Sequence, residues 1–344
     1  MSAQITPATG AAHTAILGLG VYRPERIVTN DEVAEPINSS DEWIQTRSGI
    51  KTRRFAGDGE TILSMSIAAG RDALESAGVS PDQVGTVIVA TSTWLLLTPA
   101  AAPQIATALG MTGSAGFDIS AGCAGFCHGL GIASDLVRGG TASHVLVIGV
   151  EKLTDTLDVT DRSTAFLFGD GAGAVVVGPA DAPGIGPTVW GSDGSQHHAI
   201  RQTKDWMEFF TELEEKGTDA VRPYLAMEGT AVFRWAAHSL EKVCREALDR
   251  AGVTTSDLDA MIPHQANGRI IEIMARVLGL PENCALANDI EETGNTSAAS
   301  IPLAMEALLR KGEAKPGDTA LLIAFGAGLS WAAQVVQLPA LTAA

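Results

Sequence analysis

The chain has 344 residues, of which 46% are hydrophobic and 18% are charged, and its formal net charge is −17. This length suits two domains of ordinary size, the apolar composition excludes intrinsic disorder, and the negative charge argues against nucleic acid as a partner. No apolar run of about 18 residues predicts a membrane span, and the first residues lack the basic and apolar regions of a secretory signal. The four cysteines show no disulfide spacing, so we expect a reducing, cytoplasmic location.

Predicted strands and helices alternate along the chain. In chain order we expect a strand at 14–22, a helix at 63–77, a strand at 86–91, helices at 101–109 and 123–137, a strand at 144–150, two strands around a glycine turn at 164–178, and a helix at 230–251. Residues 181–226 are irregular and rich in glycine, histidine and charge. This alternation predicts mostly parallel sheets covered by helices.

Two stretches of the sequence look like copies of each other. Residues 73–88 (ALESAGVSPDQVGTVI) match residues 247–262 (ALDRAGVTTSDLDAMI), and a weaker match joins 117–126 (FDISAGCAGF) to 288–297 (NDIEETGNTS). We therefore expect two similar halves packed about a pseudo-twofold axis, as a layered αβαβα sandwich. The predicted units are an N-terminal half at 1–180, a connecting excursion at 181–226 and a C-terminal half at 227–344.

Cys123 is the first candidate for chemistry, because it begins the apolar helix predicted at 123–137. A thiol at a helix N-terminus meets the positive end of the helix dipole, which lowers its pKa and favours the thiolate. A small buried role is the ordinary alternative for a cysteine. The repeat, however, pairs the helix that begins at Cys123 with the predicted helix that begins at Asn295. Because the two halves carry different polar side chains at this equivalent position, we infer that the position has a catalytic role. A metal site with Cys127 and His128 lacks a second group of ligands, so no metal is expected.

His264 and Asn295 are the matching candidates in the second half. His264 follows the repeated strand that ends at Ile262, where the first half has Ala90. Ligands of α/β proteins bind at such strand ends. The alternative for Asn295 is a helix N-cap, a role that asparagine favours. If the halves pack as the repeat predicts, the side chains of Cys123, His264 and Asn295 converge on one pocket.

Two glycine-rich turns need separate interpretation. GDGAGA (169–174) is superficially like a dinucleotide-binding loop, but a strand follows it where a helix is required, so we reject nucleotide binding there. FGAGLS (325–330) follows an apolar strand and is placed to bring backbone N–H groups to the pocket, as an oxyanion requires. The alternative for that segment is a simple tight turn.

Taken together, these motifs resemble β-ketoacyl-acyl carrier protein synthase III, the initiating condensing enzyme of type II fatty acid synthesis. The matching segments, from about residue 14 to residue 338, are SSDEWIQTRSGI, FDISAGCAGF, FGDGAGA, IPHQAN, TGNTSAAS and FGAGLSW. The resemblance implies the thiolase fold, a homodimer and an acyl-cysteine intermediate. It also implies condensation of an acyl-CoA primer with malonyl-acyl carrier protein, giving 3-oxoacyl-acyl carrier protein, CO₂ and CoA without a further cofactor.

The resemblance also implies a role for each matching residue. Cys123, His264 and Asn295 would be catalytic, and the backbone of Cys123 and Ala327 would form the oxyanion hole. Coenzyme A would contact Trp43, Arg47, Arg162 and Asn267; the carrier protein would contact Gln265, Ala266, Asn267, Gly268 and Arg269; and Thr98, Phe168 and Phe325 would line the acyl pocket. Because both partners are anionic and the chain carries −17, docking needs local basic residues, for which Lys51, Arg53, Arg54, Arg234 and Arg276 are further candidates.

Two positions depart from the family pattern. Gly268 stands where HQANLRI is usual, and so removes a side chain beside the expected carrier surface. Thr98 stands where several members have a bulky phenylalanine that crosses the dimer interface, which resembles actinobacterial members and suggests room for branched or longer primers. Trp94 or the leucines at 95–97 are placed to compensate for this smaller side chain.

Other functions of the same scaffold remain open. The nearest is a priming synthase of a polyketide pathway, with the same chemistry. An acyltransferase that does not condense is disfavoured by Asn295, and a degenerate, non-enzymatic partner is disfavoured by Cys123. A thiolase would carry a second cysteine near 325–331, where this chain has none. The sequence does not specify the primer, the carrier protein or the pathway.

Overall fold

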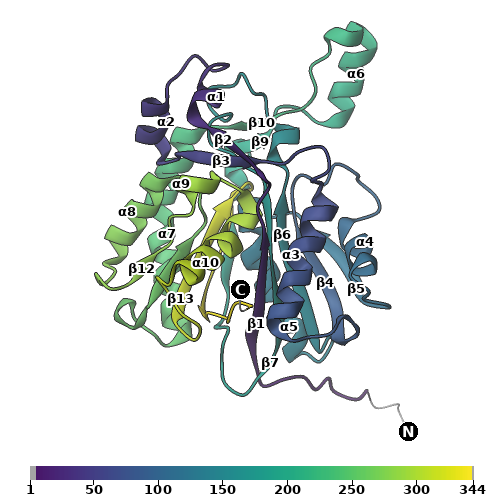
Figure 1. Cartoon of the computed structure of the whole chain (residues 1–344), viewed down its shortest axis with the longest axis vertical. Coiled ribbons are helices and arrows are strands. Elements are labelled where there is room, and N and C mark those ends of the chain that lie inside the picture. The colour runs from purple at the N-terminus through teal and green to yellow at the C-terminus, as the bar shows by residue number, and fades with distance from the viewer. Residues whose placement is uncertain (1–4, 343–344) are drawn as a thin grey trace.

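A computed structural model describes residues 5–342, in which the longest strands form two mixed sheets with the same internal order (Figure 1). The first sheet has the order β1 (His13–Tyr22), β7 (Gly171–Ala180), β6 (His144–Glu151), β4 (Val84–Ala90), β5 (Ala115–Ile119). The second has the order β8 (Val189–Ser192), β14 (Ser330–Gln337), β13 (Thr319–Gly326), β11 (Ala260–Pro263), β12 (Ala285–Leu286). In both sheets the last three strands are parallel and the first three antiparallel. This correspondence confirms the predicted duplication.

The repeated Ala-Gly-Val segments end equivalent helices. Gly78 and Gly252 cap α3 (Ile62–Ala77) and α7 (Gly229–Ala251) with φ of 63° and 71°, a left-handed conformation that glycine adopts without strain. The valine after each glycine donates its N–H to a carbonyl of the preceding helix, that of Leu74 or Leu248, at 3.1 Å in both halves. The sequence repeat is thus a repeated helix stop followed by a strand.

Helices fill three layers around the two sheets (Figure 1). α5 (Gly125–Arg138) and α10 (Ser300–Lys311) lie between the sheets, and their apolar side chains share one buried cluster with inward-facing residues of both. α3 and α4 (Ala101–Ala108) cover the outer face of the first sheet, and α7 and α8 (Gly268–Leu278) cover that of the second. Strand alternation explains the division, since Val147 faces the middle layer and Ile148 faces α3. The αβαβα sandwich is therefore confirmed.

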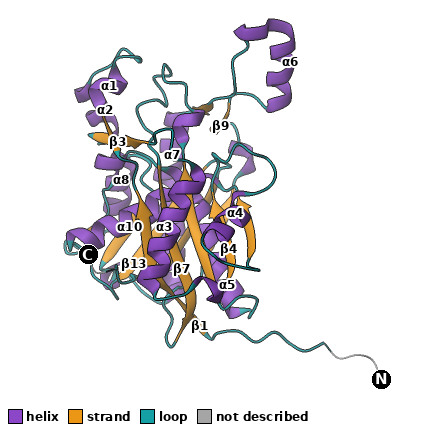
Figure 2. Ribbon diagram, turned by 45° about the vertical axis from the view of Figure 1, so that its right-hand side comes forward, coloured by secondary structure: helices purple, strands orange, loops and turns teal. Residues whose placement is uncertain are grey.

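Smaller elements gather at the end of the sandwich where the pocket opens. β2 (Arg26–Thr29), α1 (Asn30–Ala34), α2 (Asp41–Ser48) and β3 (Thr52–Phe55) pack with residues 153–168 into a separate buried cluster, which also contains Ile271 and Ile290. α6 (Trp206–Lys216) projects from this end of the molecule (Figures 1 and 2), and none of its residues is buried. The short strands β9 (Ile200–Gln202) and β10 (Leu225–Met227) pair at its base, and α9 (Ile290–Thr293) precedes Asn295.

The structure differs from the sequence expectations in two segments. Only one strand, β7, occurs within 164–178, because residues 164–168 turn away to form a β-bridge between Phe168 and Asn295. The predicted connection at 181–226 includes β8, which is part of the second sheet. Residues 1–4 and 343–344, which the predicted halves include, lie outside the described residues. Among residues 5–342, no helix has both the length and the apolar character needed to cross a lipid bilayer.

Candidate active site

One cavity of about 450 Å³ brings the three candidate catalytic residues together. Cys123 comes from the start of the middle layer, His264 follows β11, and Asn295 follows α9. The remaining lining includes most of the residues predicted to bind substrates: Trp43, Arg47, Arg162, Phe168, Ala266, Asn267, Arg269 and Phe325. The predicted convergence of side chains from both halves is thus present in the structure.

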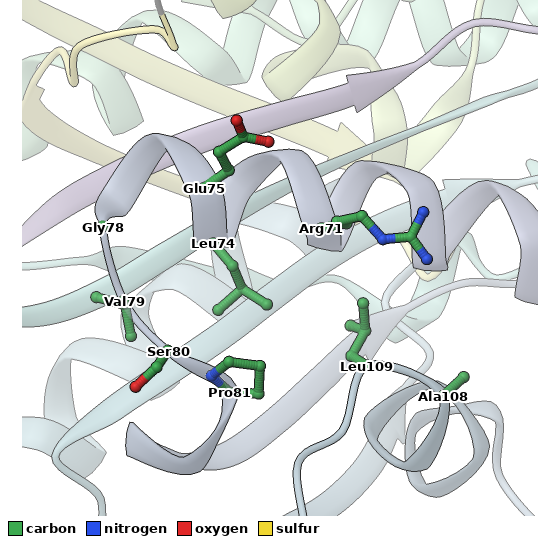
Figure 3. Close-up of a pocket in the computed structure, with 9 residues that line it drawn as sticks. All are labelled: Arg71, Leu74, Glu75, Gly78, Val79, Ser80, Pro81, Ala108 and Leu109. Carbon is green, nitrogen blue, oxygen red and sulfur yellow. The ribbon is translucent and has the colours of Figure 1, made fainter.

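A second concavity of similar volume, about 460 Å³, lies between the C-terminal ends of α3 and α4 (Figure 3). Its wall combines apolar side chains such as Leu74 and Leu109 with two oppositely charged residues, Arg71 and Glu75. It contains none of the predicted site residues. The cavity at Cys123 is therefore the candidate active site.

Cys123 lies where two backbone segments from different halves touch. It occupies the 3₁₀ turn Gly122–Ala124 that leads into α5. A Cβ added to Gly326 would lie 2.6 Å from the backbone nitrogen of Cys123, and one added to Gly122 would lie 2.9 Å from that of Ala327. The end of β13 and the start of α5 therefore pack backbone to backbone. This contact brings together the two residues whose N–H groups were predicted to form an oxyanion hole.

The thiol of Cys123 does not have the lowered pKa that the helix N-terminus predicts. Burial raises its pKa to about 12, and the nearby carboxylate of Glu151 adds to the rise, although a hydrogen bond with Ser297 opposes it. The expectation was wrong because desolvation of the thiolate outweighs the helix dipole. Cys127 lies within the apolar core of the middle layer, where burial also raises its pKa, and it does not line the cavity.

The ring of His264 is held as a neutral hydrogen-bond donor. Its backbone N–H donates to Ile323 O at 2.7 Å, which extends β11 beside β13, and its Nδ1 lies 2.7 Å from Ser300 Oγ. That hydroxyl also accepts the N–H of Gln265 at 3.4 Å, so its own proton is free to point at Nδ1. We assign the ring proton to Nε2, the nitrogen left for the pocket, with Nδ1 accepting from this hydroxyl. Burial lowers the pKa of His264 to about 3, which keeps the ring neutral.

Asn295 is fixed by its backbone and by one side-chain atom. Its N–H donates to Leu167 O at 2.8 Å, and its carbonyl accepts from Gly169 at 3.0 Å. Its Oδ1 accepts the N–H of Ser297, two residues further along, at 2.9 Å. The N-cap of the turn at 297–299 is Thr296, so Asn295 is not an N-cap, and the bond to Oδ1 leaves the Nδ2 amide as the donor that can face the pocket.

The mouth of the cavity carries an aromatic ring between two cations. The guanidinium of Arg162 lies 4.7 Å from the ring centre of Trp43, and that of Arg47 lies 5.4 Å from it. Asn267 ties this group to α8, because its Nδ2 donates to Arg47 O at 3.0 Å. On the opposite rim, Arg269 lies over Phe233. A planar base with attached phosphates suits a flat ring flanked by guanidinium groups.

Several predicted contacts do not fit the structure as expected. Gln265 is fully buried; its amide donates to Pro263 O and accepts the N–H of Ile290, so it is not available for a surface contact with a carrier. Arg53 is also fully buried, with its guanidinium bound to Asn30 Oδ1 and Phe166 O, and so cannot dock an anionic partner. Both side chains hold the wall of the pocket in place.

Gly268 and Thr98 also acquire a physical explanation. A Cβ at Gly268 would lie 2.9 Å from Ser48 O, so the glycine allows α8 to approach α2 closely. The missing Cβ would point at the backbone of α2 rather than at a carrier surface. Thr98 is exposed, beside the exposed leucines at 95–97, and does not line the cavity of its own chain.

Sequence reasoning missed three residues behind the site. Ser300 Oγ lies 2.7 Å from Nδ1 of His264, and Ser297 donates its backbone N–H to Asn295 Oδ1 and lowers the pKa of Cys123. Glu151 accepts the hydroxyl of Ser297 at 3.0 Å. The two serines lie in TGNTSAAS, shortly after Asn295. Their closeness to Asn295 in the sequence is what could have identified them as residues near the site. Nothing local in the sequence relates Glu151 to Cys123.

Known proteins of similar sequence and structure match nearly the whole chain. Models of 3-oxoacyl-[acyl-carrier-protein] synthase III and of its C-terminal part match residues 117–194 and 248–338. A beta-ketoacyl-[acyl-carrier-protein] synthase III of Mycobacteroides abscessus is 59% identical over 335 residues, covering 97% of this chain and 98% of that one. One of Streptomyces glaucescens is 56% identical over 336 residues, covering 98% and 99%.

Solved structures agree with the sequence matches. The priming beta-ketosynthase of the R1128 polyketide biosynthetic pathway superimposes with a TM-score of 0.93 at 46% identity, covering 99% of this chain and 100% of that one. A 3-oxoacyl-(acyl carrier protein) synthase III of Pseudomonas aeruginosa superimposes with a TM-score of 0.87 at 38% identity, covering 96% and 100%.

Proposed function

Because the chain belongs to the β-ketoacyl-acyl carrier protein synthase III family, with its thiolase-like fold, we propose how this pocket carries out the family's condensation. The enzyme is an acyltransferase that initiates fatty acid synthesis. In our proposal it joins an acyl-CoA primer to malonyl-acyl carrier protein. The observation that carries the proposal is one cavity in which the thiol of Cys123 meets the nitrogen donors of His264 and Asn295.

In the first half-reaction, Cys123 takes the acyl group from coenzyme A. The Cys123 sulfur forms a bond to the thioester carbon, the carbon–sulfur bond to CoA breaks, and the thiol proton leaves with the CoA sulfur. The tetrahedral oxyanion needs two donors, and we assign them to the N–H groups of Cys123 and Ala327, which the close approach of β13 to the turn before α5 supports. A cysteine sulfur suits this step because it attacks a thioester and later leaves again as a thiolate.

In the second half-reaction, loss of CO₂ from the malonyl thioester makes the carbon nucleophile. The bond to the carboxylate breaks and its electron pair passes into an enolate, whose oxygen accepts from Nε2–H of His264 and Nδ2–H of Asn295. The enolate carbon attacks the acyl-cysteine, and the Cys123 thiolate leaves and regains a proton from solvent. A neutral His264 suits this role, because the ring donates a hydrogen bond and has no charge to lose.

The mouth supports the proposed binding of both substrates. Trp43, Arg47 and Arg162 offer the adenine and phosphates of CoA a flat ring between two cations. Arg269 is exposed on the opposite rim, where it is available to the acidic carrier protein. The net charge of −17 makes long-range attraction of these anions unfavourable, so recognition depends on such local contacts.

We also propose that the enzyme is a homodimer. β5 lies at the edge of its sheet with Phe117 37% exposed, and the segment 95–97 presents three leucines that are 48%, 49% and 88% exposed. An unpaired strand edge beside exposed apolar side chains is a surface that proteins normally cover. A second copy placed there would bring its pocket close to Thr98 of the first copy. The predicted role of Thr98 in the partner's acyl pocket requires such an arrangement.

The second candidate is a starter-unit priming ketosynthase, which the structural match to the R1128 enzyme favours. Its chemistry is the same, so a panel of acyl-CoA primers assayed with malonyl-carrier proteins of both pathways separates the two.

Incubation with acyl-CoA alone tests the shared mechanism. We expect intact-protein and peptide mass spectrometry to show one acyl group on Cys123, and Cys127, one helical turn away, serves as an internal control. Acyl label on Cys127, or on no cysteine, would refute the proposal.

A further inference from the structure

Glu151 is a buried carboxylate that the proposed mechanism does not use. It ends β6, has no exposed surface and is not part of the cavity lining. Donors from two directions converge on it: Ser92 N at 3.1 and 3.2 Å, Ser92 Oγ at 2.9 Å, Thr93 Oγ1 at 2.6 Å, Thr91 Oγ1 at 3.3 Å and Ser297 Oγ at 3.0 Å. Both oxygens act as acceptors, which is the pattern of a carboxylate held in one orientation.

On one side, Glu151 reaches the catalytic residues through Ser297. The hydroxyl of Ser297 donates to Glu151, and its backbone N–H holds Asn295 Oδ1 at 2.9 Å. Ser297 also lies near the Cys123 thiol, whose pKa it lowers. Ser297 has φ of 49°, a left-handed conformation that is strained for a non-glycine residue. Such a residue persists only where its surroundings hold it, and the bond to Glu151 supplies that restraint.

On the other side, Glu151 holds the segment that leads to Thr98. Ser92 and Thr93 both bond to the carboxylate, and Thr93 Oγ1 also accepts the N–H of Lys152 at 2.9 Å. Residues 94–98 follow directly and carry the exposed leucines. One carboxylate therefore joins the segment proposed to reach the partner's acyl pocket to the turn that holds the side chain of Asn295.

We propose that Glu151 is a positioning residue, which through Ser297 fixes the Asn295 amide beside the Cys123 thiol and ties it to residues 91–98. This inference rests on the proposed condensation and names what aligns it. Glu151 is not placed as the base for Cys123, because donors from residues 91–93 and Ser297 occupy both of its oxygens. The role of Glu151 requires two acceptor oxygens. A glutamine side chain would replace one of these oxygens by an NH₂ donor, which would then face another donor without an acceptor between them.

The test compares Glu151→Gln with Ser134→Ala. Ser134 is a matched control because its hydroxyl makes one buried bond to Thr14 at 2.7 Å, away from the cavity. We expect Glu151→Gln to lower kcat for condensation about ten- to a hundredfold, with KM for acyl-CoA within about twofold, because small displacements of reacting groups are costly. Ser134→Ala should lower Tm while kcat stays within about twofold of wild type.

The inference is wrong if kcat of Glu151→Gln matches that of Ser134→Ala, or if only KM changes. Should Glu151→Gln fail to fold, Ser297→Ala carries the test, since it cuts the link to the site and leaves the bonds of Glu151 to Ser92 and Thr93. A kcat for Ser297→Ala equal to that of Ser134→Ala then overturns the inference. Wild-type protein that fails to condense acyl-CoA with malonyl-carrier would instead refute the proposed function itself.

Discussion

Replacing Gly326 by alanine should disable the oxyanion hole without changing a catalytic side chain. The added Cβ would lie 2.6 Å from the backbone nitrogen and 2.9 Å from the Cβ of Cys123. Neither atom can rotate away, so the start of α5 and the end of β13 must separate by about 0.8 Å to reach ordinary contact. The N–H of Cys123 then leaves the position in which it meets the oxyanion.

The expected loss follows from the two costs of that separation. Losing one oxyanion donor lowers the rate of acyl transfer by about a hundredfold or more. Overpacking of the contact costs about 1–3 kcal/mol in the free energy of unfolding. Because Gly326 lies behind the nucleophile rather than at the mouth, the KM for acyl-CoA should change much less than the rate.

Rapid-quench mass spectrometry of Cys123 acylation measures the effect directly, and thermal unfolding measures the stability cost. Gly194→Ala is the control, because an added Cβ meets nothing within 4 Å there. Gly122→Ala probes the same contact from the other side, where the added Cβ would lie 2.9 Å from the backbone nitrogen of Ala327. Wild-type acylation by Gly326→Ala would show that the backbone of Cys123 does not stabilise the oxyanion.

Five further predictions concern the other parts of the site. Asn295→Ala should still acylate Cys123, seen by intact mass, but lose most malonyl decarboxylation; near-normal condensation would leave Asn295 only its bond to Ser297. Burial lowers the pKa of His264 from 6.5 to about 3, so the ring stays neutral and decarboxylation should show no inflection near pH 6.5. For the same reason, the stability that His264 contributes is complete above pH 6.5 and is lost as the pH falls toward about 3, which acid unfolding can measure. Arg269→Glu should raise the KM for malonyl-carrier severalfold and leave acylation by acyl-CoA within about twofold; equal effects on both would mean that the two substrates share one contact surface. Thr98→Phe should shift kcat/KM toward acetyl-CoA over branched primers by about 1–3 kcal/mol, and an unchanged preference in a dimer confirmed by size would exclude Thr98 from the pocket.

The duplicated architecture was predictable because its signals are local. The helix stops at Gly78 and Gly252 depend on a few neighbouring residues, and the same short pattern occurs twice in the sequence. The pairing of Cys123 with the Asn295 helix then follows from symmetry, since equivalent segments occupy equivalent places. His264 was predictable for a similar reason, because it directly follows a strand whose counterpart ends in Ala90.

The properties that escaped prediction depend on contacts between distant segments. Gln265 reads as part of an exposed motif, yet the segment that includes Ile290 covers it. The pKa of Cys123 depends on the desolvation that the surrounding halves impose, which no local rule about helix ends includes. Gly268 is explained only once the backbone of Ser48 is seen beside it.

The floor and the mouth of the pocket have different structural origins, with consequences for how such an enzyme diversifies. The floor, with Cys123, adjoins the middle layer through Ala124, Phe126 and Cys127, so a substitution there disturbs the packing of both halves at once. The mouth, with Trp43 and Arg162, belongs to the small cluster appended at one end. Mutations at the mouth can therefore change which substrates enter the pocket while the reaction at Cys123 is kept. In this way one ancestral scaffold can supply condensing enzymes to several metabolic routes.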